Sequence, residues 1–223
     1  MTILEAMKAR HSVRSYTDQP ISQELIQKLN SEIKACNREG NLHIQLVTNE
    51  KKAFDGLMAH YGKFSGVQNY IALVGKKNSD LDEKLGYYGE RIVLLAQSLG
   101  LNTCWVAMTV SKSIVKKNIE VKFDEKLRII ISLGYGSTQG AEHKSKEISK
   151  FCTMNQQNPQ WFIDGVKAAM LAPTAMNQQK FYFDLDGSKV SAKSLGKFYS
   201  KIDLGIVKYH FEIGAGKENF TWK

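Results

Sequence analysis

The chain has 223 residues, and 31 Lys+Arg against 22 Asp+Glu give it a formal net charge of +9. At about 150 residues per domain, it has room for one large domain or two small ones, and either can bury a core without disulfides or metals. A hydrophobic content of 43% with 24% charged residues excludes a largely disordered chain. No apolar run reaches the roughly 20 residues of a membrane helix and no secretory signal is apparent, so we expect a soluble cytoplasmic protein with no membrane partner.

The first half of the chain alternates helical and extended patterns. Residues 2–9 predict a short helix opened by a capping box of Thr2 and Glu5. Ser22 is a plausible N-cap for a second helix. The elements predicted after it are strands at 42–47 and 70–75, a long helix at 81–99 and a buried strand at 128–134.

In the second half the pattern partly starts again. Residues 160–171 predict a helix, 172–179 a loop, and 181–190 a strand that enters an Asp-Gly hairpin turn. Residues 203–214 predict a last helix that ends at a glycine. Helices covering a central sheet indicate the α+β class.

Cysteine and histidine spacing gives no sign of a metal site. Cys36, Cys104 and Cys152 are far apart, and none of the five histidines forms an HxxxH pair. We therefore expect buried free thiols, with neither a zinc site nor a disulfide framework.

The positive excess is spread along the chain in lysine pairs and in the 143–150 stretch. Nucleic-acid binding is one hypothesis for such a charge, but no basic helix or aromatic RNA-binding signature accompanies it. We expect most of these lysines to be solvated and a few to hold a phosphate-bearing ligand, with no nucleic-acid partner.

Two short segments carry residues suited to ligand binding. In Arg10-His11-Ser12-Val13-Arg14, two guanidiniums, an imidazole and a hydroxyl can donate to a phosphate or an electron-rich ring. In the loop 172–179, APTAMNQQ, amide side chains can donate to and accept from the edge of a flat ring. Taken singly, each segment is better explained without a ligand, the first as a solvated basic turn and the second as a helix-ending loop.

Taken in order, the segments resemble the FMN-dependent nitroreductase family. The pattern R-[RH]-S-x-R is matched at 10–14, and A-P-S-x-x-N-x-Q is matched at 172–179 with threonine in place of serine. Residues 88–105 and the LGYG strand at 133–136 resemble further family segments. The resemblance implies a nitroreductase-like fold, in which helices flank a central mixed sheet.

The resemblance also implies site residues. The FMN phosphate and ribityl chain would be held by Arg10, His11, Ser12, Lys144 and Lys146. The isoalloxazine ring would be contacted by Pro173, Thr174, Ala175 and Asn177. Arg14 would lie beside flavin N1, where a fixed cation stabilises the reduced flavin and raises its reduction potential.

One departure from the family is informative. In common members the P-S-x-x-N loop comes soon after the basic turn, whereas here it comes late, as in a smaller subgroup of the family. The hypothesis is an internal pseudo-dimer of two unequal halves, in which residues 1–150 carry the basic turn and 151–223 the loop. It predicts one FMN site per chain and leaves further homodimerisation open.

The implied activity is that of an NAD(P)H-dependent flavin oxidoreductase. Hydride would pass from a transiently bound NADH or NADPH through flavin N5 to a nitroaromatic, a quinone or a similar small oxidised acceptor. No catalytic side chain is required of the protein beyond the tuning by Arg14. The alternative is a flavin-binding storage or sensor module with little turnover.

Overall fold

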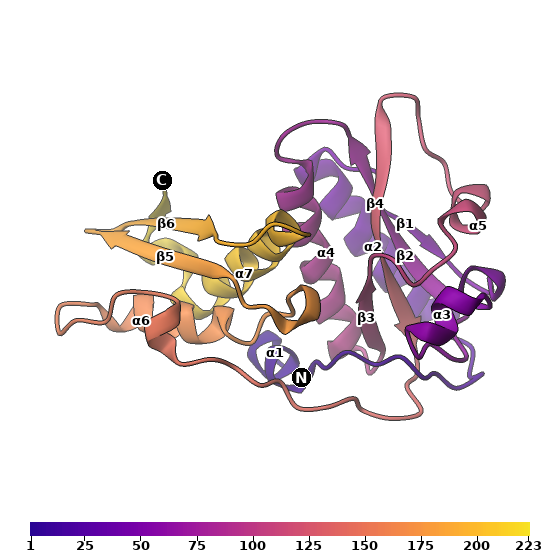
Figure 1. Cartoon of the computed structure of the whole chain (residues 1–223), viewed down its shortest axis with the longest axis horizontal. Helices are drawn as coiled ribbons and strands as arrows, with labels where there is room; N and C mark the ends of the chain where they lie inside the picture. Colours follow the sequence, from indigo (N-terminus) through magenta and orange to yellow (C-terminus); the bar gives the residue numbers. More distant parts are fainter. The chain divides into compact units, whose positions relative to one another are not determined.

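The computed structural model describes residues 1–223, apart from the side chain of Met58. The chain divides into two units, whose helices and strands are labelled in Figure 1. Unit 1 comprises residues 1–8, 82–91 and 143–223, and unit 2 comprises 9–81 and 92–142. Helix α4 (Leu81–Ser98) contributes residues to both.

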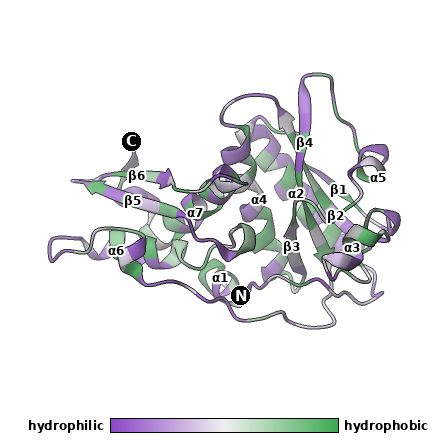
Figure 2. Ribbon diagram, viewed as in Figure 1, coloured by the Kyte–Doolittle hydropathy of each residue, from purple (hydrophilic) through white to green (hydrophobic). Residues whose placement is uncertain are grey.

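Unit 2 is built on a four-stranded sheet in which neighbouring strands are antiparallel. Its strand order is β1 (Gln45–Val47), β2 (Asn69–Lys76), β4 (Glu125–Gly134) and β3 (Asn102–Val106). The two central strands, β2 and β4, are almost fully buried, as their continuous apolar sequences require, and Figure 2 shows hydrophobic residues along them. The helical elements of this unit are α2 (Gln23–Gly40), α3 (Leu57–Tyr61), α5 (Lys112–Lys117) and the 3₁₀ turn η1 (Lys52–Phe54).

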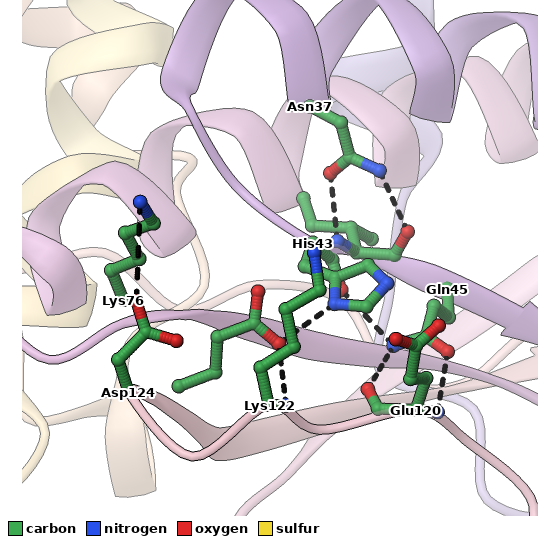
Figure 3. A network of polar contacts seen from close by, with 9 residues as sticks. Asn37, His43, Gln45, Lys76, Glu120, Lys122 and Asp124 are labelled. Atoms are coloured by element: carbon green, nitrogen blue, oxygen red, sulfur yellow. Dashed lines mark hydrogen bonds and ion pairs between the residues drawn. The ribbon is translucent and has the colours of Figure 1, made fainter.

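A network of side-chain to backbone hydrogen bonds fixes the entry into β1 (Figure 3). The amide of Asn37 accepts from the Ile44 nitrogen at 2.7 Å and donates to the Ile44 carbonyl oxygen at 2.9 Å. The amide of Gln45 bonds Glu120 in the same two-way manner, at 2.8 and 2.7 Å. These bonds satisfy the backbone groups of Ile44, just before the strand, and of Glu120.

The same network contains a partly buried ion pair. His43 Nδ1 lies 2.8 Å from Glu125 Oε2, which also accepts from the Lys122 nitrogen at 2.9 Å. Burial by itself raises the pKa of Glu125, but the hydrogen bonds from His43 and Lys122 outweigh burial and leave the pKa below its ordinary value.

Unit 1 combines helices with a small mixed sheet. The helices are α1 (Ile3–Ala9), whose last residue falls in unit 2, α6 (Gln160–Ala169) and α7 (Ser200–Ala215). The strands are β5 (Phe181–Asp186), β6 (Lys189–Ser194) and β7 (Thr221–Trp222), with β5–β6 antiparallel and β6–β7 parallel. The 3₁₀ turns are η2 (Ile148–Lys150), η3 (Ala175–Asn177) and η4 (Lys217–Asn219).

Aromatic rings form the core of unit 1. Phe151 stacks on Phe181 with ring centroids 4.5 Å apart, and Phe183 stacks on Phe211 at 4.6 Å. All four side chains are fully buried. The alternation of Phe181 and Phe183 along β5 is what directs both rings to the same face.

Residues 82–91 of α4 lie against α7 at a crossing made by two glycines. A Cβ at Gly86 would lie 2.0 Å from the Ile202 carbonyl oxygen, and a Cβ at Gly205 would lie 1.9 Å from the Glu83 carbonyl oxygen. The crossing therefore requires glycine at both positions. Further along, the fully buried His210 bonds Glu90 at 2.9 Å, which ties the two helices together with a polar contact.

The fold confirms the α+β class and most of the predicted elements. The capping box is present, with the Thr2 nitrogen 2.7 Å from a Glu5 carboxylate oxygen, and Ser22 caps α2. The strand expected from residue 42 begins at Gln45, and α7 begins three residues earlier than expected, at Ser200. The elements β3, α3, α5 and β7 were not predicted.

Two further observations concern the cysteines and the helices. The three cysteines are buried free thiols, as predicted. Within the described part of the chain, no helix combines the length and the hydrophobicity needed to cross a bilayer.

Candidate functional site

The basic segment, residues 10–14, is an extended stretch of unit 2 attached to the edge strand β3. Ser12 forms a parallel bridge with Thr103, and the Val13 nitrogen donates to the Thr103 carbonyl oxygen at 3.0 Å. The bridge is an isolated parallel contact at the edge of the antiparallel sheet. Because neighbouring side chains of an extended chain point to opposite sides, burial of Val13 directs Arg14 outward.

Arg14 is the most available cation of the segment. Its side chain is exposed, and its backbone is held by a bond of 3.0 Å from the Ser65 nitrogen to the Arg14 carbonyl oxygen. The guanidinium carbon lies 6.0 Å from the centre of the Phe64 ring, within the range of a cation–π contact. The ring face orients the guanidinium without using its five N–H donors.

His11 is positioned by the segment that follows β4. Its Nδ1 lies 3.1 Å from the Gln139 carbonyl oxygen. A carbonyl oxygen can only accept, so Nδ1 carries the proton, and Nε2 is the nitrogen that can meet a ligand. Gly140 packs directly on this site, because a Cβ there would lie 2.8 Å from His11 Cβ and 3.0 Å from the Ser12 carbonyl oxygen. Its φ of +76° also favours glycine.

The other two members of the segment are less available. Arg10 is only 3% exposed. The hydroxyl of Ser12 bonds the thiol of Cys104, whose pKa is raised chiefly by burial. Their assignment to the FMN phosphate stays a prediction.

The amide loop, residues 172–179, follows α6 in unit 1 and has an unusual backbone. Met176, Asn177 and Gln179 have φ angles of 53°, 51° and 47°, in the left-handed region that residues other than glycine seldom adopt. The Thr174 hydroxyl helps to close the loop by accepting from the Gln179 nitrogen at 3.0 Å. A backbone with three such residues persists only where its surroundings restrain it.

Gln179 supplies much of that restraint. Its side chain is 5% exposed, and its Nε2 donates to the Lys144 carbonyl oxygen and to Asn177 Oδ1, both at 2.8 Å. Its Oε1 accepts from the Lys146 nitrogen at 2.9 Å. The motif contained this residue, but we did not predict it as a site residue, because nothing local reveals a bond to a segment more than thirty positions away.

The predicted residues Asn177, Lys144 and Lys146 come together around Gln179. Asn177 Nδ2 donates to the Lys144 carbonyl oxygen at 3.1 Å, and Lys146 Nζ donates to the Gln178 carbonyl oxygen at 2.6 Å. The Asn177 amide still has one N–H and one oxygen lone pair for a ligand. The side chain of Lys144 is exposed.

Asp203, on the first turn of α7, is a second residue that we did not predict. It is 6% exposed and accepts hydrogen bonds from the Ala175 nitrogen at 3.0 Å and from Gln178 Nε2 at 2.7 Å. It therefore restrains the amide loop from the side of α7.

The predicted site residues thus form two sets. The basic segment, with Arg10, His11, Ser12 and Arg14, belongs to unit 2. Unit 1 contains Lys144, Lys146, Pro173, Thr174, Ala175 and Asn177. The two lysines, which the resemblance groups with the basic segment, are bonded to the amide loop.

Comparison with known proteins identifies one family over nearly the whole chain. The family described as "Putative TM nitroreductase" matches residues 2–215. A crystal structure of a "putative nitroreductase" from Thermotoga maritima MSB8 is 25% identical, with a TM-score of 0.67, over 98% of this chain and 85% of that one.

Two more distant structures share the fold. One is described as a "putative nitroreductase in complex with FMN" from Desulfovibrio desulfuricans; it is 16% identical, with a TM-score of 0.56, over 71% of this chain and 99% of that one. The other, an FMN-dependent nitroreductase from Clostridium difficile R20291, is 20% identical, with a TM-score of 0.51, over 69% and 98%. A search of the curated proteins found no matching sequence.

Proposed function

Because the chain belongs to the family described as "Putative TM nitroreductase", we propose that it is an FMN-dependent NAD(P)H oxidoreductase acting on small oxidised acceptors such as nitroaromatics and quinones. The nitroreductase fold supports a flavin oxidoreductase, and two structures of similar fold are described as FMN-dependent or FMN-bound. Among this chain's own residues, Arg14 supports the proposal most directly, because it is an exposed cation on a backbone that is fixed to the sheet.

The donor chemistry of both sets fits FMN. Arg14 offers a positively charged group for the ring edge or the phosphate, and the exposed ammonium group of Lys144 can add charge-assisted bonds, whereas His11 Nε2 can accept a hydrogen bond from a ribityl hydroxyl. In the amide loop, the remaining N–H and lone pair of Asn177 suit a ring edge that alternates donors and acceptors. Bound FMN would supply hydride transfer at N5 between NAD(P)H and the acceptor.

This chain's residues would bind and orient the cofactor. Arg14 would stabilise the negative charge that reduction places on the ring edge. Pro173, Thr174 and Ala175 would present the backbone of the amide loop to the ring. The proposal needs no general base, and it attributes the net positive charge to the cofactor site and the surface without a nucleic-acid partner. We further propose that the protein works in the cytoplasm.

The pseudo-dimer hypothesis is part of the proposal. If the halves 1–150 and 151–223 supply complementary parts of one site, the protein binds one FMN per chain. Titration of flavin-free protein with FMN, followed by the quenching of flavin fluorescence, tests this directly. Saturation well below one FMN per chain would contradict the pseudo-dimer, and no binding at all would contradict the proposed cofactor.

A turnover assay separates the reductase from a flavin storage or sensor module. We expect NADH or NADPH to be oxidised in a steady state when a quinone or nitroaromatic is added to the FMN-loaded protein. FMN binding without such turnover would favour the storage or sensor function. Sedimentation of the loaded protein would show whether chains also form a homodimer.

A further inference from the structure

The carboxylate of Asp203 holds the amide loop through both of its oxygens. Oδ1 accepts from the backbone nitrogen of Ala175 at 3.0 Å, and Oδ2 accepts from Gln178 Nε2 at 2.7 Å. The two partners stand on either side of Met176 and Asn177, where the backbone has positive φ. Asp203 therefore spans the strained part of the loop.

Gln178 extends this contact to the segment that precedes α7. Its Nε2 also donates to the Phe198 carbonyl oxygen at 3.2 Å, and its backbone nitrogen donates to the Ala175 carbonyl oxygen at 3.0 Å. Gly196 lies close by, since a Cβ there would be 3.3 Å from Gln178 Oε1. The loop is thus tied to the start of α7 by a continuous set of hydrogen bonds that ends at a buried charge.

A buried carboxylate depends strongly on such donors. Asp203 is 6% exposed, so with the loop in place its charged carboxylate has little access to water and depends on the two hydrogen bonds that the loop donates. The neutral acid depends less on hydrogen-bond donors than the carboxylate does. Its O–H would also face the Ala175 nitrogen or Gln178 Nε2, each of which is itself a donor. The ionised form of Asp203 is therefore the form that restrains the loop.

We propose that Asp203 is a positioning residue for flavin binding, which holds the amide loop in the conformation that receives the isoalloxazine ring. This inference rests on the proposed function, because it takes the loop to be the ring-facing part of the site.

Asp203 changes its protonation state in a pH range that binding and spectroscopic experiments can reach. Burial raises the pKa of this carboxyl group to about 6, and the hydrogen bonds from Gln178 and Ala175 oppose the rise without cancelling it. No neighbouring charge contributes to the pKa. The lysines of the adjoining segments have exposed side chains; they are Lys146, Lys180, Lys197 and Lys201. The restraint should therefore weaken as the pH falls through about 6.

Nuclear magnetic resonance of the flavin-free protein tests the contact by itself. The amide proton of Ala175 should titrate with a midpoint near pH 6, and Asp203→Asn should abolish the titration. Gln178→Leu removes one donor to the carboxylate and should move the midpoint upward. Asp186→Asn, the same change at an exposed carboxylate of unit 1, should leave the midpoint unchanged. An Ala175 amide that does not titrate, or one that titrates equally in Asp203→Asn, would overturn the proposal.

FMN binding tests the consequence. A carboxyl group with a pKa near 6 is about nine-tenths protonated at pH 5, so the wild-type Kd should rise up to about tenfold between pH 7.5 and pH 5. The FMN phosphate also takes up a proton near pH 6, but this effect is common to all variants. Asp203→Asn should lack the additional rise, and Asp203→Ala should bind FMN more weakly at every pH.

The proposed cofactor and the positioning role of Asp203 can be refuted independently. If the wild type binds no FMN at any pH, the proposed function fails, while the Ala175 titration still shows whether Asp203 restrains the loop. If FMN binds with the same pH profile in the wild type and Asp203→Asn, the cofactor stands and the positioning role of Asp203 is wrong.

Discussion

Replacing Gln179 with methionine should loosen the amide loop while keeping the length of the buried side chain. The substitution removes three side-chain hydrogen bonds, two donated by Nε2 at 2.8 Å and one accepted by Oε1 at 2.9 Å. At about 1 kcal/mol net for each bond, the total is about 3 kcal/mol.

Part of that loss will be recovered from water. The backbone groups of Lys144 and Lys146 lie in an exposed segment, so both can bond solvent once Gln179 releases them. We therefore expect the free energy of unfolding to fall by about 1.5–3 kcal/mol, a shift of about 1 M in the urea midpoint. Gln156→Ala, at an exposed position of the same unit, should change it by less than about 0.5 kcal/mol.

Urea unfolding followed by circular dichroism gives the stability difference, and hydrogen exchange at the Lys146 amide locates it. Gln179→Met should remove the exchange protection of that amide, whereas Gln156→Ala should preserve it. If Gln179→Met unfolds at the same urea concentration as Gln156→Ala with the Lys146 amide still protected, the hydrogen bonds of Gln179 do not restrain the loop.

Three other predictions address the cofactor, the helix crossing and pH. Arg14→Ala should lower the midpoint potential of bound flavin by about 20–40 mV, because a cation worth about 1–2 kcal/mol to the reduced ring converts at about 30 mV per 1.4 kcal/mol. Potentiometry checks this against Arg38→Ala, and an unchanged potential would remove Arg14 from this role. Gly205→Ala places a Cβ 1.9 Å from a backbone oxygen of α4 and should destabilise the protein by at least about 3 kcal/mol, whereas Gly56→Ala, with nothing within 4 Å, should be nearly neutral in the same urea assay. In global unfolding Asp203 returns to water, and its pKa changes from about 6 to the unfolded value of 3.8. Its contribution to the free energy of unfolding is therefore present below 3.8 and is lost as the pH rises through 6, although the ionised form is the one that restrains the loop within the folded protein. The stability of the wild type relative to Asp203→Asn should therefore fall by about 2.4 kcal/mol from pH 4 to pH 7, and a constant difference would contradict the assignment.

Features set by neighbouring residues could be predicted from the sequence. The capping box of Thr2 and Glu5, the N-cap at Ser22 and the hairpin between β5 and β6 all depend on residues within a few positions of one another. The family resemblance was likewise carried by short motifs. These signals were enough for the fold class and for the family.

Features set by distant contacts could not be predicted in this way. The sequence of β3, NTCWV, has no clear alternation, and its extended form comes from pairing with β4. Asp203 is 28 positions from Ala175, and no spacing rule connects an acid on a helix to a loop that far away. The burial of Arg10 is also a property of the folded unit, since the sequence only shows an arginine next to a histidine.

The two lysines show that chain order does not reveal which segments a site residue contacts. The resemblance groups Lys144 and Lys146 with the basic segment, but in unit 1 their backbone atoms are bound by the side chains of Gln179 and Asn177. Because these bonds involve backbone groups, the amide loop sets where both cations lie, whatever ligand they meet. A substitution at Gln179 therefore displaces two charges without removing either. If these lysines hold the phosphate and the loop receives the ring, as proposed, both functions depend on the same loop conformation and should be lost together.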